Sequence, residues 1–212
     1  MKISDAIYNG KTKIKNIIFD WGGVITNLRH DIIIEGFRNI GLEIYKEPDL
    51  WKELFIPFEI GKISPTEFRN KIRNYIENNI EDQLIDDIWN SILGDVPAKR
   101  WKILEKVSLK YRTFLLSNTN RIHKEYYFRY LHTIYGTDGF AHLFEKMYFS
   151  YMLNMRKPDR EIFDFVLNNA EIRASETLFI DDLIENIETA QNMGFITIHL
   201  KSPLTLADVF AD

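Results

Sequence analysis

Residues 14–23 read IKNIIFDWGG, and this stretch decides the fold. The run of β-branched and aromatic residues up to Phe19 is typical of a buried strand, and it stops abruptly at Asp20. Gly22 and Gly23 follow, and glycines directly after a strand indicate a tight turn or a close approach to the backbone. The stretch therefore predicts a core strand that ends in a carboxylate.

Four later apolar runs have the same character, and helical periodicity separates several of them. The strand-like runs cover residues 113–116, 147–149, 178–180 and 195–200, and the helical stretches cover 160–169 and 184–193. Strands that alternate with helices predict an α/β fold, in which a parallel sheet is covered on both faces. In such a sheet the carboxyl ends of the strands form the ligand crevice, so the polar residues that follow the strands should converge there. These residues are Asp20, Ser117, Lys157 and Asp182.

The stretch from residue 28 to residue 110 has helical periodicity and no comparable strand signal. Its helical patterns cover residues 32–40, 65–77, 82–93 and 98–109. One of these helices has a strong start, because Ser64 suits the N-cap, Pro65 the first turn and Glu67 the third position of a capping box. We therefore expect a helical cap domain at 28–110, inserted into a core formed by residues 1–27 and 111–212.

Composition excludes several classes of function. The chain has 212 residues, an apolar fraction of 45% and a charged fraction of 27%, all ordinary for a soluble globular protein. A net charge of -4 offers no basic surplus for a nucleic-acid backbone. The absence of cysteine excludes thiolate nucleophiles, disulfides and cysteine-bound metals. Residues 1–15 contain no long apolar stretch, so we expect no membrane anchor and a cytoplasmic location. The sequence does not specify an oligomeric state.

Acidic residues follow two of the strand-like runs, and they are candidates for a metal site. Asp20 either forms an ordinary turn, since Asp-x-Gly is common after strands, or it serves a site that the glycines leave open to a metal or a phosphate. Asp181 and Asp182 repel each other unless a cation or hydrogen bonds offset the repulsion. Magnesium prefers such oxygen ligands, although an acidic first turn of a helix is an equally good explanation for this pair alone.

Two further segments suit an anion. Ser117, Asn118 and Thr119 offer a hydroxyl and backbone N–H groups before a helix, a pattern that serves either anion binding or plain helix capping. Lys157, followed by Pro158, could neutralise a phosphate and an attacking carboxylate, or could simply be a solvated residue at a helix start.

Taken together and in order, these segments resemble the four motifs of the haloacid dehalogenase (HAD) superfamily. The segments are residues 20–24 (DWGGV), 116–120 (LSNTN), 156–158 (RKP) and 179–182 (FIDD). Residues 117–121 with His123, 155–158, and Asp181-Asp182 with Asn186-Ile187 are similar to the bacterial α-D-glucose-1-phosphate phosphatase group. The resemblance implies a HAD-like, Rossmann-type parallel sheet core with an all-helical cap inserted after the first strand.

The resemblance also implies a role for each site residue. Asp20 would be the nucleophile that forms an aspartyl-phosphate intermediate, and it would bind Mg²⁺ together with the Gly22 carbonyl. Asp182 would bind the metal directly, with Asp181 close by or acting through water. The later position Asn186 would orient a water or a carboxylate.

The resemblance assigns the remaining positions to the phosphate. Ser117 and the Asn118 N–H would hold phosphate oxygens. Lys157 would stabilise charge on both Asp20 and the phosphoryl group. Positioning and charge neutralisation of this kind are what phosphoryl transfer requires.

One position departs from the superfamily pattern. Many relatives carry a second aspartate two residues after the nucleophile, as general acid and base, and this chain has Gly22 there. General acid–base catalysis contributes about 10²–10⁴-fold, so the absence of this acid has to be accounted for. Three readings remain: an acidic anomeric leaving group that needs less assistance, a replacement acid at His123 or Glu59, or a slow enzyme. His123 is otherwise a structural or solvent-facing residue.

Two other segments lie near these motifs. Residues 58–62 form either a specificity turn of the cap or an ordinary interhelical loop. Trp21 either walls the site or belongs to the core.

The sequence thus predicts a magnesium-dependent phosphohydrolase that acts on a small phosphorylated metabolite. A sugar phosphate such as glucose 1-phosphate is the favoured substrate. The alternatives are a metal-independent 2-haloacid dehalogenase, which also uses an aspartate nucleophile, and a non-catalytic ligand sensor on a phosphatase scaffold.

Overall fold

The computed structural model describes residues 14–44, 46–136 and 141–210. The expectation of no membrane anchor rests on residues 1–15, and residues 1–13 of that stretch lie outside the described part of the chain. Among the helices of the described part, none has both the length and the apolar composition needed to cross a membrane.

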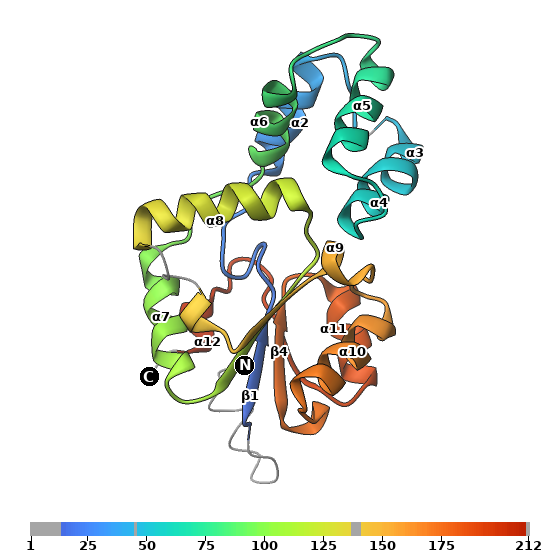
Figure 1. Cartoon of the computed structure of the whole chain (residues 1–212). Helices are drawn as coiled ribbons and strands as arrows, with labels where there is room; N and C mark the ends of the chain where they lie inside the picture. Colours follow the sequence, from blue (N-terminus) through green and yellow to red (C-terminus); the bar gives the residue numbers. More distant parts are fainter. Residues whose placement is uncertain (1–13, 45, 137–140, 211–212) are drawn as a thin grey trace.

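The core contains a five-stranded parallel sheet, which confirms the predicted fold class (Figure 1). Its strands lie in the order β3-β2-β1-β4-β5. They are β1 (Asn16–Phe19), β2 (Arg112–Ser117), β3 (Lys146–Phe149), β4 (Thr177–Asp181) and β5 (Ile196–His199). The first strand of the chain therefore lies at the centre, so that Asp20 leaves the sheet between the ends of β2 and β4.

Successive residues of β1 face opposite sides of the sheet, as the two-residue period of a strand requires. Ile17 and Phe19 join one hydrophobic cluster and Ile18 joins the other. Because β1 is buried on both faces, its sequence is a continuous apolar run rather than an alternation.

Helices cover both faces of the sheet (Figure 1). One face carries α10 (Arg160–Ala170) and α11 (Ile184–Asn192), whose apolar stripes include Phe163 and Ile187. The other face carries three helices whose residues share the cluster of Ile17 and Phe19. These are α7 (Ala98–Ser108), α8 (Arg121–Tyr135) and α12 (Leu206–Val209). Short helical segments η2 (Ala141–Leu143), α9 (Ser150–Leu153) and η3 (Ala174–Glu176) complete the core.

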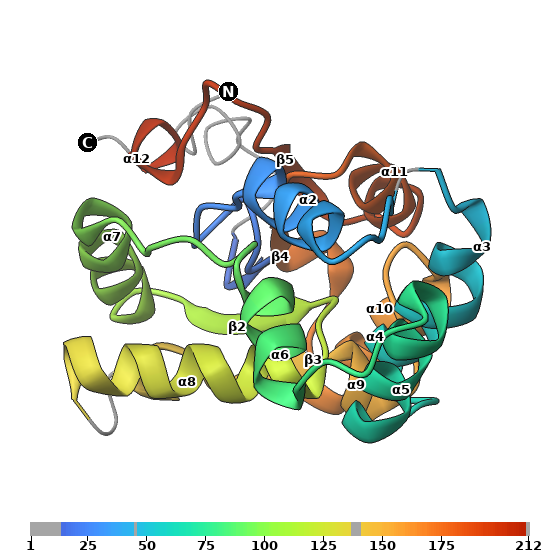
Figure 2. The same ribbon diagram turned by 90° about the horizontal axis from the view of Figure 1, so that it is seen from above.

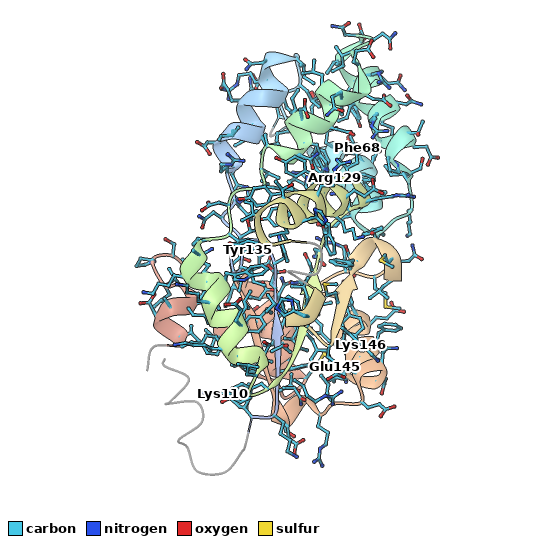
Figure 3. The ribbon with its side chains drawn as sticks, turned by 60° about the vertical axis from the view of Figure 1, so that its left-hand side comes forward. Phe68, Lys110, Arg129, Tyr135, Glu145 and Lys146 are labelled. Carbon is cyan, nitrogen blue, oxygen red and sulfur yellow. The ribbon has the colours of Figure 1, made fainter. Side chains whose placement is uncertain are left out.

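A helical cap lies over the carboxyl ends of the strands (Figures 1 and 2). It consists of α2 (His30–Asn39), α3 (Pro48–Leu50), η1 (Trp51–Phe55), α4 (Ile56–Glu59), α5 (Pro65–Ile76) and α6 (Asp82–Asn90). The cap has its own apolar cluster, in which Phe58 stacks on Phe68 with ring centroids 4.3 Å apart. Phe68 lies among the cap helices, at the end of the molecule opposite to Lys110 (Figure 3). The predicted capping box is present at the start of α5, since Ser64 and Glu67 bond to each other's backbone N–H groups.

The chain enters and leaves the cap through two segments that run side by side. Leu28 and Leu93 form an antiparallel bridge. The Arg29 N–H donates to the Ile92 carbonyl at 2.8 Å, and the Gly94 N–H donates to the Asn27 carbonyl at 2.8 Å. A side chain at residue 94 would place its Cβ 2.6 Å from that carbonyl oxygen, so the crossing requires glycine.

This crossing places the end of the cap earlier than the sequence suggested. We expected the cap to extend to residue 110, but α7 packs against the sheet, with Trp101, Leu104 and Val107 in the core cluster. Helical periodicity located α7 correctly. It does not indicate which hydrophobic cluster the apolar face of a helix joins.

Candidate active site

The polar residues predicted to converge do come together at the carboxyl end of the sheet. The Asp20 N–H donates to the Ile180 carbonyl at 2.9 Å, which places Asp20 beside Asp181 at the end of β4. Ser117 is the last residue of β2, on the other side of β1, and it is buried. Adjacent parallel strands thus deliver all three side chains to one edge.

Lys157 lies at the centre of the site and is only 1% exposed. Its ammonium nitrogen donates to Asp20 Oδ1 at 2.6 Å and to Asp181 Oδ2 at 2.7 Å. The same nitrogen lies 5.6 Å from the centre of the Phe179 ring, which further fixes the side chain. A buried charge requires such partners, so Lys157 is a structural centre of the site as well as a cation.

Asn118 holds the backbone of Lys157. Its Oδ1 accepts from the Lys157 N–H at 2.9 Å, and its Nδ2 donates to the Lys157 carbonyl at 2.8 Å. The sequence predicted a role only for the backbone N–H of Asn118 and did not indicate this use of the side chain. The pattern of a lone asparagine after a strand carries no signal for it.

The two acidic residues after β4 differ in their surroundings. Asp181 is fully buried, and its Oδ1 accepts from the Leu183 N–H and from Asn186 Nδ2, both at 2.9 Å. Asn186 therefore orients a carboxylate, which is one of the two roles expected for it. Asp182 is less buried, and its Oδ2 would lie 2.3 Å from a Cβ added at Gly23. Gly23 has a φ of +71°, so both its conformation and the nearby carboxylate require glycine.

The electrostatics of the cluster favour a cation. Burial raises the pKa of Asp20 to about 7, with the Asp181 and Asp182 carboxylates adding to the effect and Lys157 opposing it. Burial and the neighbouring Asp181 also raise the pKa of Asp182. Burial alone would lower the pKa of Lys157, but Asp181 and Asp20 together raise it, so the ammonium stays charged.

The residues present fit a divalent metal. Carboxylate oxygens of Asp20, Asp181 and Asp182 all lie within 4.8 Å of one another. When all three are ionised, these carboxylates carry two more negative charges than the Lys157 ammonium compensates, and hard oxygen ligands of this kind suit Mg²⁺. Oδ1 of Asn186 is also buried and has no hydrogen-bond partner among the described residues.

Gly22 has no side chain and cannot act as an acid, and the side chain of another residue lies where its Cβ substituents would be. A Cβ added there would lie 3.2 Å from Leu28 Cδ1. The Leu28 side chain thus occupies the space beside Gly22, and a larger residue would require it to move.

The side chain of His123, one of the two proposed replacement acids, bonds to groups outside the carboxylate cluster. Its Nε2–H donates to the Trp89 carbonyl at 2.9 Å, and its Nδ1 lies 3.1 Å from Asn120 Nδ2. The ring also stacks on the Trp89 indole at 4.9 Å. Desolvation lowers the pKa of His123 to about 4. The residue is therefore a neutral link between α8 and the cap, which supports the structural role and not the solvent-facing or acid role.

Trp21 belongs to the core, whereas the cap segment at residues 58–62 lies beside the site. Trp21 packs edge-to-face on Tyr127 at 4.8 Å and belongs to the core cluster. Glu59 lies at the end of α4 and forms an ion pair with Arg156 at 2.8 Å, next to Lys157. The segment at residues 58–62 is therefore more than a loop between helices, because it contacts the core beside the site.

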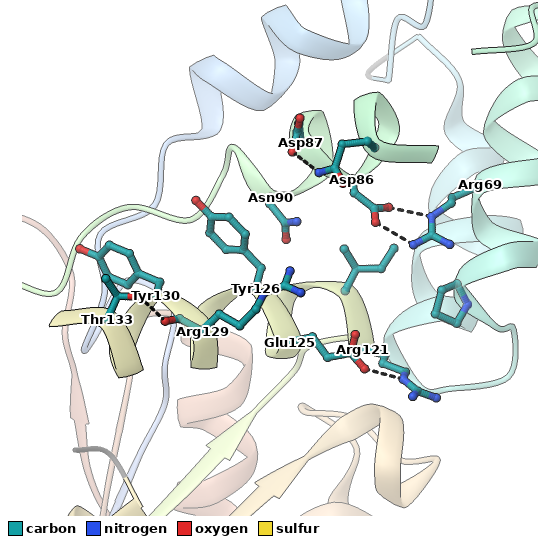
Figure 4. Close-up of a pocket in the computed structure, with 13 residues that line it drawn as sticks. Arg69, Asp86, Asp87, Asn90, Arg121, Glu125, Tyr126, Arg129, Tyr130 and Thr133 are labelled. Atoms are coloured by element: carbon teal, nitrogen blue, oxygen red, sulfur yellow. Dashed lines mark hydrogen bonds and ion pairs between the residues drawn. The ribbon is translucent and has the colours of Figure 1, made fainter. Parts of the chain in front are cut away.

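A separate groove of about 690 Å³ lies between α5, α6 and α8 (Figure 4). Arg69 and Asp86 pair across its cap side, and Arg121 and Glu125 pair on α8. The groove contains none of the residues that the sequence predicted for catalysis.

Comparison with known proteins agrees with this geometry. Residues 14–194 match the family model of haloacid dehalogenase-like hydrolases. The chain is 30% identical to the D-ribitol-5-phosphate phosphatase of Bacteroides thetaiotaomicron, over 87% of this chain and 90% of that protein.

Solved structures are similar over most of the chain. A HAD family enzyme of Bacteroides thetaiotaomicron, in complex with magnesium and inorganic phosphate, is 38% identical with a TM-score of 0.85, over 93% of this chain and 99% of that one. A predicted HAD-like hydrolase of Porphyromonas gingivalis is 32% identical with a TM-score of 0.80, over 88% and 91% of the two chains. The match spans the motifs at Asp20, Ser117, Lys157 and Asp181-Asp182, and the chain belongs to the haloacid dehalogenase-like hydrolases.

Proposed function

We propose that this protein is a magnesium-dependent phosphatase of small phosphorylated metabolites, with sugar and polyol phosphates as its substrate class. The observation that carries the proposal is the buried Lys157 ammonium, 2.6 Å from Asp20 Oδ1 and 2.7 Å from Asp181 Oδ2. A lysine in this position keeps a nucleophilic carboxylate close to a cation and to the carboxylates that suit a metal.

In the proposed reaction, a carboxylate oxygen of Asp20 attacks phosphorus while the bond to the leaving-group oxygen breaks. The leaving-group oxygen takes up a proton from solvent and departs as the alcohol. Water then attacks the aspartyl-phosphate and gives up a proton to solvent, the bond between phosphorus and Asp20 breaks, and inorganic phosphate leaves. Lys157 neutralises charge in both steps, and Ser117 and the Asn118 N–H hold phosphate oxygens. Asp20, Asp182, the Gly22 carbonyl and Asp181 would hold Mg²⁺, which supplies further charge neutralisation when bound.

The surroundings of Gly22 bear on the substrate. Gly22 has no side chain, His123 is neutral and bonded to Trp89, and the Glu59 carboxylate is paired with Arg156, so we assign proton donation to the leaving group to none of the three. An anomeric hydroxyl is more acidic than an ordinary alcohol and needs less assistance, which favours a sugar 1-phosphate such as glucose 1-phosphate. The phosphatase relative named for D-ribitol 5-phosphate supports a polyol phosphate as the second candidate.

The test is release of inorganic phosphate from a panel that contains glucose 1-phosphate, D-ribitol 5-phosphate, other sugar phosphates and nucleotides. We expect turnover with Mg²⁺ and its loss in a chelator. Absence of phosphate release throughout the panel would contradict the proposal and favour a ligand sensor. Halide release from 2-chloropropionate that persists in the chelator would instead indicate a dehalogenase.

A further inference from the structure

The turn at residues 59–61 of the cap is docked on the core segment that leads to Lys157. The hydroxyl oxygen of Ser150 lies 2.6 Å from the Glu59 carbonyl oxygen, and Asn154 Nδ2 donates to the Ile60 carbonyl at 2.8 Å. Both contacts reach the backbone of the turn, so they fix where its chain runs.

Gly61 permits an even closer approach. A Cβ at this position would lie 2.2 Å from the carbonyl oxygen of Tyr151, and the φ of Gly61 is +70°. Only glycine tolerates both the conformation and the approach. The turn and α9 thus fit together along several consecutive residues.

An ion pair adds a charged contact to this fit. Arg156 Nε donates to Glu59 Oε2 at 2.8 Å, and the two side chains are 28% and 26% exposed. Burial raises the pKa of Glu59, while Arg156 and then Lys157 oppose the effect. The Glu59 carboxylate therefore attracts both Arg156 and Lys157, and this attraction offsets the repulsion between these two adjacent cations.

Arg156 is covalently next to Lys157, whose backbone is held from the other side. Asn118 bonds to both the N–H and the carbonyl of Lys157. The segment 156–157 thus has one anchor in the core, at Asn118, and one in the cap, at Glu59. A shift of either anchor would move the lysine relative to Asp20.

We infer that Arg156 is a positioning residue: through its ion pair with Glu59 it sets the position of Lys157 according to whether the cap turn is docked. The catalytic lysine is in place only when the cap lies on α9. This inference rests on the proposed phosphatase function and adds to it a coupling between cap and chemistry that the motifs do not contain.

The kinetic test uses Glu59→Gln, Arg156→Gln and the double variant. Because the pair acts as one unit, we expect kcat to fall about tenfold in each single variant and no further in the double variant. The fall should be equal for a sugar phosphate and for p-nitrophenyl phosphate, since Lys157 acts on the phosphoryl group. Arg156→Lys keeps the charge and should recover part of the loss.

The kinetic test has a matched control, and two results would contradict the inference. Arg160→Gln breaks the exposed Arg160–Asp164 pair on α10 and should leave kcat unchanged. Losses that multiply to about a hundredfold in the double variant would overturn the inference, because they would show independent roles. A loss confined to the sugar phosphate would overturn it too, because it would indicate contact with the leaving group.

A second measurement follows the position of the cap relative to the core and does not depend on catalytic activity. The chain has no cysteine, so Asn74→Cys on α5 and Asn168→Cys on α10, both exposed, can carry a unique pair of spin labels. We expect the distance distribution between the labels to broaden when Glu59→Gln is added. Identical distributions would overturn the inference, whereas wild-type protein that releases no phosphate would count against the proposed function alone.

Discussion

The ammonium nitrogen of Lys157 lies between two carboxylates, 2.6 Å from Asp20 Oδ1 and 2.7 Å from Asp181 Oδ2. These carboxylates come from neighbouring strands, β1 and β4, and the lysine comes from the loop before α10. A single buried cation thus fixes the nucleophile proposed for phosphoryl transfer and one member of the proposed metal site.

Asp20→Asn should abolish phosphate release. The amide is neither a nucleophile nor a strong metal ligand, so we expect kcat to fall on the order of a thousandfold or more. The side chain keeps its size and an oxygen for Lys157, so circular dichroism should show an unchanged fold. Substantial turnover by this variant would contradict a covalent mechanism at Asp20.

Gly23→Ala should impair metal binding by displacing Asp182. The new Cβ would lie 2.3 Å from Asp182 Oδ2 in the present geometry, and the positive φ adds backbone strain. In the wild type, Mg²⁺ at a hundred times its dissociation constant should add about 2.7 kcal/mol to the free energy of unfolding, and the variant should lose most of this.

Gly194→Ala is the matched control for that variant. Gly194 has a φ of +86°, and apart from its chain neighbours no atom of the described residues lies within 4 Å of an added Cβ, so it shares the strain without the clash. Thermal unfolding with and without Mg²⁺ should show a normal metal effect in Gly194→Ala. An equal loss of the metal effect in both variants would show that Asp182 is not the cause.

Asn118→Ala should lower kcat through Lys157. The variant loses both hydrogen bonds that hold the lysine backbone, so we expect kcat to fall about 10- to 100-fold with a smaller change in KM. Asn168→Ala, at an exposed asparagine of α10, serves as control in the same assay. Equal kinetics of the two variants would count against a role for the Asn118 side chain.

His123 should make the stability of the protein depend on pH. Desolvation lowers the pKa of His123 from its ordinary value of 6.5 to about 4. Between these values the unfolded chain binds the proton and the folded chain does not, so the free energy of unfolding falls as the pH drops from 6.5 to 4. The contribution is on the order of 3 kcal/mol.

Replacing the residue isolates that contribution. Urea unfolding of the wild type and of His123→Gln at several pH values gives the difference in their free energies of unfolding, in which the titration of other groups cancels. We expect the advantage of the wild type to shrink as the solution is acidified through this range. A difference that stays constant with pH would show that His123 titrates normally.

The sequence predicted the parts of the site that follow from strand topology. Asp20, Ser117 and Asp181 lie at strand ends, and parallel strands that end at one edge bring such residues together whatever the details of packing. Lys157 could be added because the ordered motifs resemble those of a known superfamily. Both predictions depend on local patterns that the sequence displays directly.

The contacts made by side chains across the fold were not predictable in this way. The bonds from Asn118 to Lys157 join residues 39 positions apart, and the Glu59–Arg156 pair joins residues 97 apart. The assignment of α7 to the core depends on which of two apolar clusters receives Trp101 and Leu104. Periodicity shows that such a helix has an apolar face, but only the tertiary structure shows what covers it.

The bridge between Leu28 and Leu93 bears on how such proteins diversify. The chain leaves the core and returns to it at adjacent points. A short turn could therefore join these two points in place of the cap without changing the sheet. Natural selection can therefore lengthen or exchange the parts of the cap that lie away from the turn at residues 59–61, while the strand ends of the core and Asp20 keep their places. The same property makes the cap the natural target for engineering new substrate preferences.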